Sequence, residues 1–540
     1  MHRNLLFPLT ILVAVITLNS CKTADKGGLP IPKDAGFVFH INTPSLASKL
    51  TWQEINETGW FKELYTDAPD SVAKQILADP ASSGISADAD MVFFSTRRGK
   101  GGYAVLEGTL KDAAAFEAFN KKVQKQTTVK KNGDINIIES NAGPGIATWS
   151  GTRFIYVLDM PTMAWVDRNS GYNQPERYSI DSLTAIAKEL YSLEGSKSLT
   201  SEKKYAELLK ETGDFHMWVN AETMFGGMAS DMLSMMKASI LFEGSISAAT
   251  FNFDNGKIVM NTKTYYNDVI GKVYEKYRMK NFDVQAFNRV PAKNVIAAFA
   301  MNYPPDGLKE FMKVIGVDGF VNSYMGEIGY SVDEFVKANK GDILVTVSDF
   351  EIKTEQVTIP AYDENGQPSV ITRSSPSMKV LFATSVNDKP AFDKLVAALK
   401  EKMGGMFEDG RTPKISYSLN DKWFAAGNAE EQVNGFLAGS SSNNHSFISK
   451  ISGHPAGFYL DLHKIIEASG QAETDSTSRS KKMLDASLKM WEDVIMTGGE
   501  IKDGAYSATV VVNLVDKNTN SLKQLNQYID RMHEDKKSGF

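Results

Sequence analysis

The sequence predicts an α+β fold, built as a tandem duplication of antiparallel sheets covered by helices. The first observation behind this prediction is a unit that occurs twice, at 103–123 and 379–399. Each copy has a short apolar strand, a polar turn with an aspartate at one fixed place (Asp112, Asp388), and an amphipathic helix. An aspartate there can accept hydrogen bonds from the first backbone amides of the helix.

The second observation is that neighbouring elements recur in the same order. Asn-Gly pairs at 132–133 and 255–256 predict tight hairpins. Strands joined by hairpins, with helices between them, predict antiparallel sheets covered by helices. The matched elements are strand 36–41 with 295–302, hairpin 91–96/103–109 with 343–347/379–385 (a longer connection through Asn365-Gly366), strand 214–220 with 457–462, and strand 257–266 with 506–515.

The bulk composition indicates an ordinary folded protein. Hydrophobic residues make up 42% and charged residues 23% of the 540 residues, which is typical of globular chains. The net charge of −6 argues against a nucleic-acid partner, which would need a basic face. The predicted domains are a signal peptide (1–20), a tether (21–34), a first α+β half (35–285) and a second α+β half (286–540).

The N-terminus predicts export. His2 and Arg3 precede mostly apolar residues 5–18, a stretch shorter than the roughly 20 residues that span a bilayer. Leu18-Asn19-Ser20-Cys21 resembles the lipobox of bacterial lipoproteins, in which the cysteine is diacylated. The resemblance implies that Cys21 is the lipid attachment site and that the lipid anchor binds the protein to a membrane. Cys21 is the single cysteine, so it has no cysteine partner within the chain.

The tether bears on location. Lys22 follows the cysteine where an aspartate would retain some bacterial lipoproteins in the inner membrane. We therefore expect an outer-membrane lipoprotein. Between Cys21 and Lys33 only Asp25 is acidic, so the sequence leaves open whether the protein faces the periplasm or the cell surface.

Motifs for chemistry are sparse, and we predict no catalytic, cofactor-binding or metal-binding residues and no cofactor. His463 and Glu467 lie four apart on a predicted helix, but two ligands without a third make a poor metal site. Four Ser-x-x-Lys matches lack any accompanying Lys-Thr-Gly and are attributed to chance. They are Ser71/Lys74, Ser201/Lys204, Ser234/Lys237 and Ser478/Lys481.

Three stretches could bind ligands, although each has a plainer interpretation. The basic turn 97–102 could hold an anion, but such turns are usually solvated hairpin tips. The aromatic stretch around Tyr172 and Tyr178 could stack on a glycan. A methionine stripe could bind apolar partners, although its spacing is typical of a helix packed on its sheet; it comprises Met224, Met228, Met232, Met235 and Met236.

The leader, the Pro-Lys-Asp-Ala-Gly-Phe opening at 32–37 and the repeated strand–aspartate–helix unit resemble an uncharacterised family of Bacteroidota lipoproteins. In that family a large exported region of unknown function follows the lipobox. The resemblance implies an envelope location and carries over no catalytic residues. We therefore expect a non-enzymatic scaffold or binding component of the envelope, with an envelope protein as candidate partner. The alternatives are an envelope hydrolase with an unrecognised acidic or metal site, and a glycan- or peptide-binding module of an uptake system.

Overall fold

The computed structural model describes residues 29–68, 70–98, 101–124, 127–140, 143–160, 177–225, 237–359, 369–407, 415–439, 443–470 and 478–537. These residues form two compact units. Unit 1 contains the described residues of 29–225 together with Leu241–Tyr265 and Thr519–Glu534. Unit 2 contains residues 237–240, the described part of Tyr266–Asn518, and residues 535–537. Cys21 and the rest of the predicted leader lie outside the described residues.

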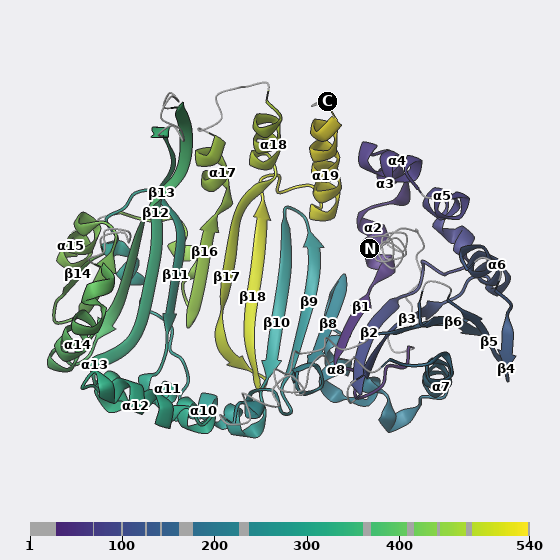
Figure 1. Cartoon of the computed structure of the whole chain (residues 1–540), viewed down its shortest axis with the longest axis horizontal. Coiled ribbons are helices and arrows are strands. Elements are labelled where there is room, and N and C mark those ends of the chain that lie inside the picture. Colours follow the sequence, from purple (N-terminus) through teal and green to yellow (C-terminus); the bar gives the residue numbers. More distant parts are fainter. Residues whose placement is uncertain are drawn as a thin grey trace, which may run out of the picture. The chain divides into compact units, whose positions relative to one another are not determined.

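Unit 1 is built on antiparallel strands that pair in the order β10–β9–β8–β1–β2–β3–β7–β6–β5–β4 (Figure 1). Both faces of its central strands are covered, and the first half of β2, Met91–Phe94, is accordingly a continuous apolar run. The strands are β1 (Phe37–Ile41), β2 (Met91–Arg98), β3 (Gly101–Thr109), β4 (Lys130–Asn132), β5 (Ile135–Glu139), β6 (Gly145–Ser150), β7 (Arg153–Asp159), β8 (Phe215–Asn220), β9 (Ile246–Asp254) and β10 (Lys257–Tyr265).

Helices cover each face of this sheet. On one face, Trp218 of β8 packs edge to face on Tyr205, with ring centroids 5.5 Å apart, beside Leu183 and Leu190. On the other face, Phe116 packs on Trp149 and Phe154. The helices are α2 (Thr43–Lys49), α3 (Trp52–Asn56), α4 (Gly59–Thr66), α5 (Ser71–Ala78), α6 (Ala113–Val123), α7 (Ile180–Tyr191), α8 (Lys203–Leu208), α9 (Ala221–Phe225) and, from the C-terminal end, α19 (Ser521–Lys537), whose residues to Glu534 belong to unit 1.

Unit 2 is built on antiparallel strands in the order β18–β17–β16–β11–β12–β13–β15–β14 (Figure 1). Its core gathers around Phe287, Phe436 and Phe447. The strands are β11 (Val295–Asn302), β12 (Asn339–Ile359), β13 (Ser369–Val386), β14 (Ser416–Leu419), β15 (Trp423–Gly427), β16 (Ala456–Asp461), β17 (Trp491–Lys502) and β18 (Ala505–Leu514). The helices are α10 (Asp268–Lys276), α11 (Pro305–Val314), α12 (Asp318–Glu327), α13 (Val332–Ala338), α14 (Lys389–Phe407), α15 (Glu430–Ala438), α16 (Ile448–Ile451), α17 (Leu462–Gly470) and α18 (Arg479–Leu488).

The α+β class is confirmed, and the strand order of unit 2 repeats that of unit 1. Strands β10, β9, β8, β1, β2, β3, β7 and β6 correspond in pairing order to β18, β17, β16, β11, β12, β13, β15 and β14. Within the repeated unit, Asp112 accepts hydrogen bonds from the amides of Ala114 and Ala115, and Asp388 accepts one from Ala391. Phe116 and Phe392 are both buried. The predicted domain boundaries stay predictions.

The β12–β13 hairpin is much longer than the predicted strands 343–347 and 379–385. It carries a bulge between Ser348 and Glu351, and the pairing then continues to Ile359 and Ser369. Residues rich in β-branched side chains, such as Val357 and Ile371, favour this extension. The predicted Asn365-Gly366 turn lies outside the described residues. Among the described helices, none is both long and apolar enough to cross a bilayer.

Helix α19 packs on α3 and α4 through residue pairs that are more than 460 positions apart in the chain. Asp530 Oδ1 accepts hydrogen bonds from the amides of Gly59 (2.6 Å) and Trp60 (3.1 Å). This carboxylate therefore caps α4, whose own N-cap residue, Thr58, makes no side-chain cap. Asn526 accepts a hydrogen bond from the Trp60 indole at 3.1 Å.

Replacing the distant cap should weaken unit 1. We expect Asp530→Ala to lower the free energy of unfolding by about 1–2 kcal/mol, the usual effect of losing an N-cap, measured by urea denaturation. Glu534→Ala, an exposed change on the same helix, is the control and should stay within about 0.5 kcal/mol of wild type. Equal stability of Asp530→Ala and the control would show that the cap contributes nothing.

Candidate functional site

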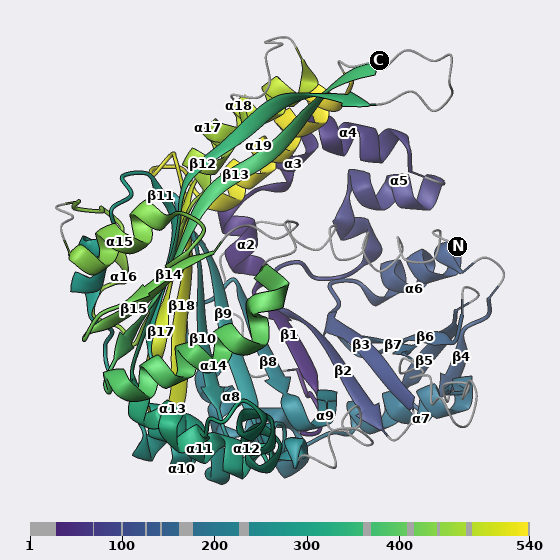
Figure 2. The same cartoon turned by 60° about the vertical axis from the view of Figure 1, so that its left-hand side comes forward.

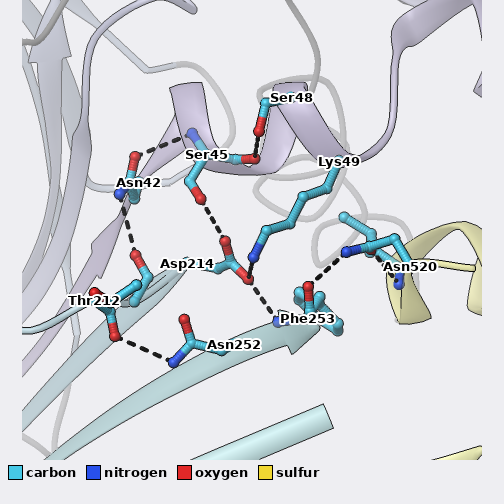
Figure 3. A network of polar contacts seen from close by, with 11 residues as sticks. Asn42, Ser45, Ser48, Lys49, Thr212, Asp214, Asn252, Phe253 and Asn520 are labelled. Carbon is cyan, nitrogen blue, oxygen red and sulfur yellow. Dashed lines mark hydrogen bonds and ion pairs between the residues drawn. The ribbon is translucent and has the colours of Figure 1, made fainter. Parts of the chain in front are cut away.

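The buried carboxylate of Asp214 joins three segments of unit 1 (Figure 3). Oδ1 accepts a hydrogen bond from Ser45 Oγ at 2.6 Å. Oδ2 accepts one from Lys49 Nζ at 2.6 Å and one from the Phe253 amide at 2.6 Å. Ser45 and Lys49 lie one helical turn apart on α2, so both reach the same carboxylate. The cluster, here called the Asp214 clamp, ties α2 to the start of β8 and the end of β9.

Local sequence explains why α2 begins where it meets Asp214. Asn42 Oδ1 accepts a hydrogen bond from the Ser45 amide at 3.1 Å and caps the helix. The next two residues, Thr43 and Pro44, open the helix, and proline suits the first turn because its missing N–H needs no partner there. Asn42 Nδ2 also donates to the carbonyl of Gly213 at 3.1 Å, which brings Asp214 to the helix.

A second polar cluster, the histidine pair, lies on the same two strands. His40 of β1 and His216 of β8 are directly opposite each other and buried. Their Nδ1 atoms are 3.3 Å apart. His40 Nε2 lies 3.1 Å from Asp90 Oδ2, and His216 Nε2 lies 2.9 Å from the carbonyl oxygen of Glu211. The four groups form one chain of contacts.

The acceptors at the two ends fix how the two rings are oriented. The Glu211 carbonyl can only accept a hydrogen bond, and it faces Nε2 of His216. The Asp90 carboxylate faces Nε2 of His40 in the same way.

The second repeat shows that the fold does not require either cluster. The backbone bond from the Asn42 amide to the Asp214 carbonyl (2.9 Å) recurs as a bond from Asn302 to Pro455 (2.8 Å). Proline offers no carboxylate, however, and the ladder positions of the two histidines are taken by Ala300 and Gly457. The charged groups of unit 1 are therefore additions to a shared backbone plan.

Unit 2 has its own polar cluster, at the other end of the corresponding strands. Asp461 of β16 and Asp493 of β17 are directly opposite each other and buried. Asp493 accepts from Lys450 Nζ at 2.5 Å and from Asn513 Nδ2 at 2.6 Å. Asp461 accepts from Tyr459 OH at 3.0 Å and from the Lys464 amide at 2.9 Å. Burial and the neighbouring Asp461 charge raise the pKa of Tyr459, so its hydroxyl remains a donor.

These contacts limit the chemistry of the clusters. Both oxygens of Asp214, Asp461 and Asp493 accept hydrogen bonds from groups of the protein itself. In the Asp214 clamp, serine and lysine both donate to the carboxylate, so the lysine is not placed to deprotonate the serine. The geometry is that of structural clamps.

A third buried charge pair joins β3 to β7. Glu107 is fully buried and forms an ion pair with Arg153, whose guanidinium also lies over the ring of Tyr191. Desolvation raises the pKa of Glu107 to about 7, against the opposing effect of the Arg153 charge and hydrogen bond. Glu107 Oε1 has no hydrogen-bond partner among the described residues, which weakens the stabilisation of the ionised form.

Two modest hollows of the described surface lie in unit 1. One, of about 380 Å³, is lined by Phe61, Tyr65 and Leu77 of α4 and α5. The other, of about 280 Å³, lies between α3 and α19, where Lys523 pairs with Glu54 at 2.6 Å. Neither hollow is lined by the histidine pair or the Asp214 clamp. The described residues contain no group of three or more His, Cys, Asp or Glu that could hold a metal ion.

The residues singled out in the sequence are scattered. His463 and Glu467 lie on α17, with no third ligand among the described residues. In the turn 97–102, Arg98 pairs with Asp34 and Glu189, both at 3.4 Å, while residues 99 and 100 lie outside the described part.

The aromatic and methionine stretches are only partly described. Tyr178 packs edge to face on Tyr103 in the core of unit 1, whereas Tyr172 lies outside the described residues. Met224 belongs to α9, where its sulfur lies beside Gly36. The other four methionines of the stripe also lie outside the described residues.

The Ser-x-x-Lys matches have ordinary structural roles where they are described. Ser478 Oγ accepts a hydrogen bond from the Lys481 amide at 3.1 Å and caps α18. Lys74 and Lys204 lie over the rings of Tyr65 and Tyr265. Ser234 lies outside the described residues.

Breaking the Asp214 clamp should be costly. Lys49→Met removes the cation that pairs with a fully buried carboxylate, and such a loss lowers the free energy of unfolding by about 3 kcal/mol. Ser48→Ala, an exposed change on the same helix, should leave the urea midpoint nearly unchanged. A wild-type midpoint for Lys49→Met would mean that Asp214 is not held by this ion pair.

Glu107 should make stability depend on pH. Its folded pKa is raised, so the folded state holds the proton to higher pH than the unfolded state does. The resulting stabilisation is fully present below about pH 4.5 and is lost as the pH rises through 7, on the order of 3 kcal/mol in all. Glu107→Gln should remove this part of the slope in urea titrations between these pH values. The surface variant Glu117→Gln should keep the wild-type slope; an unchanged slope in Glu107→Gln would contradict the assignment.

A family comparison covers most of the chain. The family described as "Domain of unknown function (DUF4836)" matches residues 30–404, which include all the strands of the first repeat and β11, β12 and β13 of the second. No curated protein and no solved structure matches the chain. The match extends over more than half of the sequence, and the chain therefore belongs to the DUF4836 family.

Proposed function

We propose that this chain is an outer-membrane lipoprotein, anchored through acylated Cys21, that serves the cell envelope as a non-enzymatic scaffold or binding component. The anchor is supported by the Leu18-Asn19-Ser20-Cys21 sequence after a short apolar segment. Acyl chains bind to a bilayer in proportion to their length, and two or more give stable attachment. The polar residues that follow Cys21 would hold the folded part away from the membrane surface.

The observation that carries the binding role is a β-ribbon in unit 2, formed by residues 351–359 of β12 and 369–377 of β13 (Figure 2). The neighbouring strand β11 pairs with β12 only as far as Ser348. On the other side, β15 pairs with β13 from Leu381 onward. Among the described strands, none pairs with the outer edges of the ribbon.

The ribbon contributes little to the core. Glu351, Lys353 and Glu355 are exposed on β12, and Val370 and Ile371 of β13 are 59% and 44% exposed. A two-stranded ribbon is at best marginally stable by itself. Exposed strands with unpaired backbone groups are a frequent means of binding another polypeptide, because their amides and carbonyls can extend a sheet. Binding accounts for the ribbon better than stability does.

Shortening the ribbon tests the binding role. Replacing residues 352–376 by Asn-Gly joins Glu351 to Ser377, which are directly opposite in the ladder. We expect the variant to unfold at the wild-type urea concentration but to lose the envelope protein recovered with the wild-type chain after crosslinking in native membranes. Recovery of the same protein by the shortened chain would exclude the ribbon as the binding element.

The anchor has its own test. Cys21→Ala should move the protein from the membrane fraction to the soluble fraction, whereas Ser20→Ala, which keeps the cysteine and a small neighbour, should leave it on membranes. Membrane association of Cys21→Ala would rule out the lipid anchor.

A further inference from the structure

The two edges of the ribbon differ in their capacity to add a strand. The β13 edge contains Pro376, opposite Ile352, and proline has no N–H to donate. The β12 edge has no proline in the ribbon. This is the same edge of β12 that pairs with β11 nearer the core. The pairing with β11 ends where the Asp349 amide donates a hydrogen bond to the Asn294 carbonyl at 3.0 Å. A strand added beyond this point would prolong the place that β11 occupies beside β12.

The charges on the β12 edge alternate in sign on one face. Glu351, Lys353 and Glu355 are successive side chains of that face, because side chains alternate along a strand. All three are exposed. Lys353 Nζ lies 3.2 Å from Glu351 Oε1 on the same strand. A strand that pairs here is favoured when it places positive charge opposite the glutamates and negative charge opposite the lysine.

We propose that the occupant of this edge is the same edge of a second copy, paired antiparallel about Thr354. The inference rests on the proposed function as a scaffold or binding component and names its partner. In this register Lys353 of each copy lies opposite Glu355 of the other, which gives two ion pairs across the interface. The remaining opposite pairs are Thr354 with Thr354, Ile352 with Gln356, and Glu351 with Val357.

Other symmetric registers are less favourable. A two-fold axis perpendicular to the ribbon keeps each side chain on its own face, so the axis must pass through a residue paired with its own copy. Centring on Lys353 places lysine opposite lysine and Glu351 opposite Glu355, and centring on Glu355 places glutamate opposite glutamate. Centring on Ile352 places Asp349 opposite Glu355, two like charges. The φ of Asp349 is 50°, so its backbone also departs from the extended conformation that strand pairing needs. Thr354 alone among these four centres brings opposite charges together without a like-charged pair.

Membrane attachment would favour this contact. Two short strands give a weak interface by themselves, but chains anchored in one membrane meet at a high effective concentration. A pairing too weak to form a dimer in dilute solution can therefore form on the membrane.

Cysteine crosslinking tests the register in the full chain. Thr354→Cys places two thiols opposite each other, with Cα atoms within the range that a disulfide spans. Mild oxidation of envelope membranes should double the apparent mass on a non-reducing gel. Ser374→Cys, directly opposite Thr354 on the other strand of the same ribbon, is the matched control and should remain monomeric.

Charge reversal tests the recognition. Added to Thr354→Cys, Lys353→Glu places glutamate opposite glutamate and should abolish the dimer. Glu355→Lys, made together with Arg373→Glu so that opposite charges still face each other within the ribbon, should also abolish it. Co-expression of the two reversed chains restores opposite charges and should restore a mixed dimer.

Several outcomes would overturn the proposal. They are a monomeric Thr354→Cys chain, equal crosslinking of Thr354→Cys and Ser374→Cys, or a dimer that Lys353→Glu leaves unchanged. Crosslinking of Thr354→Cys to a different protein would overturn self-pairing but leave the proposed binding function standing. The proposed function is tested by two other experiments. It would be contradicted if Cys21→Ala stayed on membranes, or if the chain with the shortened ribbon still recovered the same envelope protein.

Discussion

The closure of each compact unit depends on a helix that the chain supplies from a distant position. Asp530 of α19 caps α4 through the Gly59 amide at 2.6 Å, after a separation of 471 residues. In unit 2, α10 follows the last strand of the first repeat and packs beside α11, with Tyr274 and Phe311 rings 6.2 Å apart. In each case the helix after the last strand of one repeat packs against a helix that lies between the first two strands of the other. Neither repeat therefore completes its own unit, which couples the folding of the two halves.

The polar clusters differ between the repeats although the backbone plan is shared. The backbone plan of strands β1 and β8 recurs in β11 and β16, including the bond from Asn42 or Asn302 to the segment before the partner strand. Because the plan is held by backbone pairing and apolar packing, buried side chains can change once their hydrogen bonds are satisfied. Unit 1 has a histidine pair where unit 2 has Ala300 and Gly457. Unit 2 has two aspartates where unit 1 has Asn220 and Ile246.

The sequence predicted the features that depend on local chemistry. Asp112 and Asp388 cap their helices, and the strands pair in a repeated order, because capping and hairpin formation involve residues close together in the chain. The histidine pair was not predicted, since His40 and His216 are 176 residues apart and become neighbours only through the β1–β8 ladder. The only signal was a polar residue at a buried strand position, and that does not identify its partner. The length of β12 and β13 was missed for a related reason: polar, exposed strands lack the apolar pattern that marks a strand.

The two exposed edges of the ribbon need protection against unspecific pairing with other chains. Exposed strand edges promote aggregation, and proteins commonly protect them with charge and proline. Here the protection is unequal, because Pro376 blocks one edge while the other carries only Glu351, Lys353 and Glu355. Charge of a single sign would repel every copy of the same edge, whereas the alternating charges bring opposite signs together without a like-charged pair when two copies pair about Thr354. The β12 edge therefore both discourages unspecific stacking and selects one arrangement of two chains, which is the property that an envelope scaffold would need from a strand left without a neighbour.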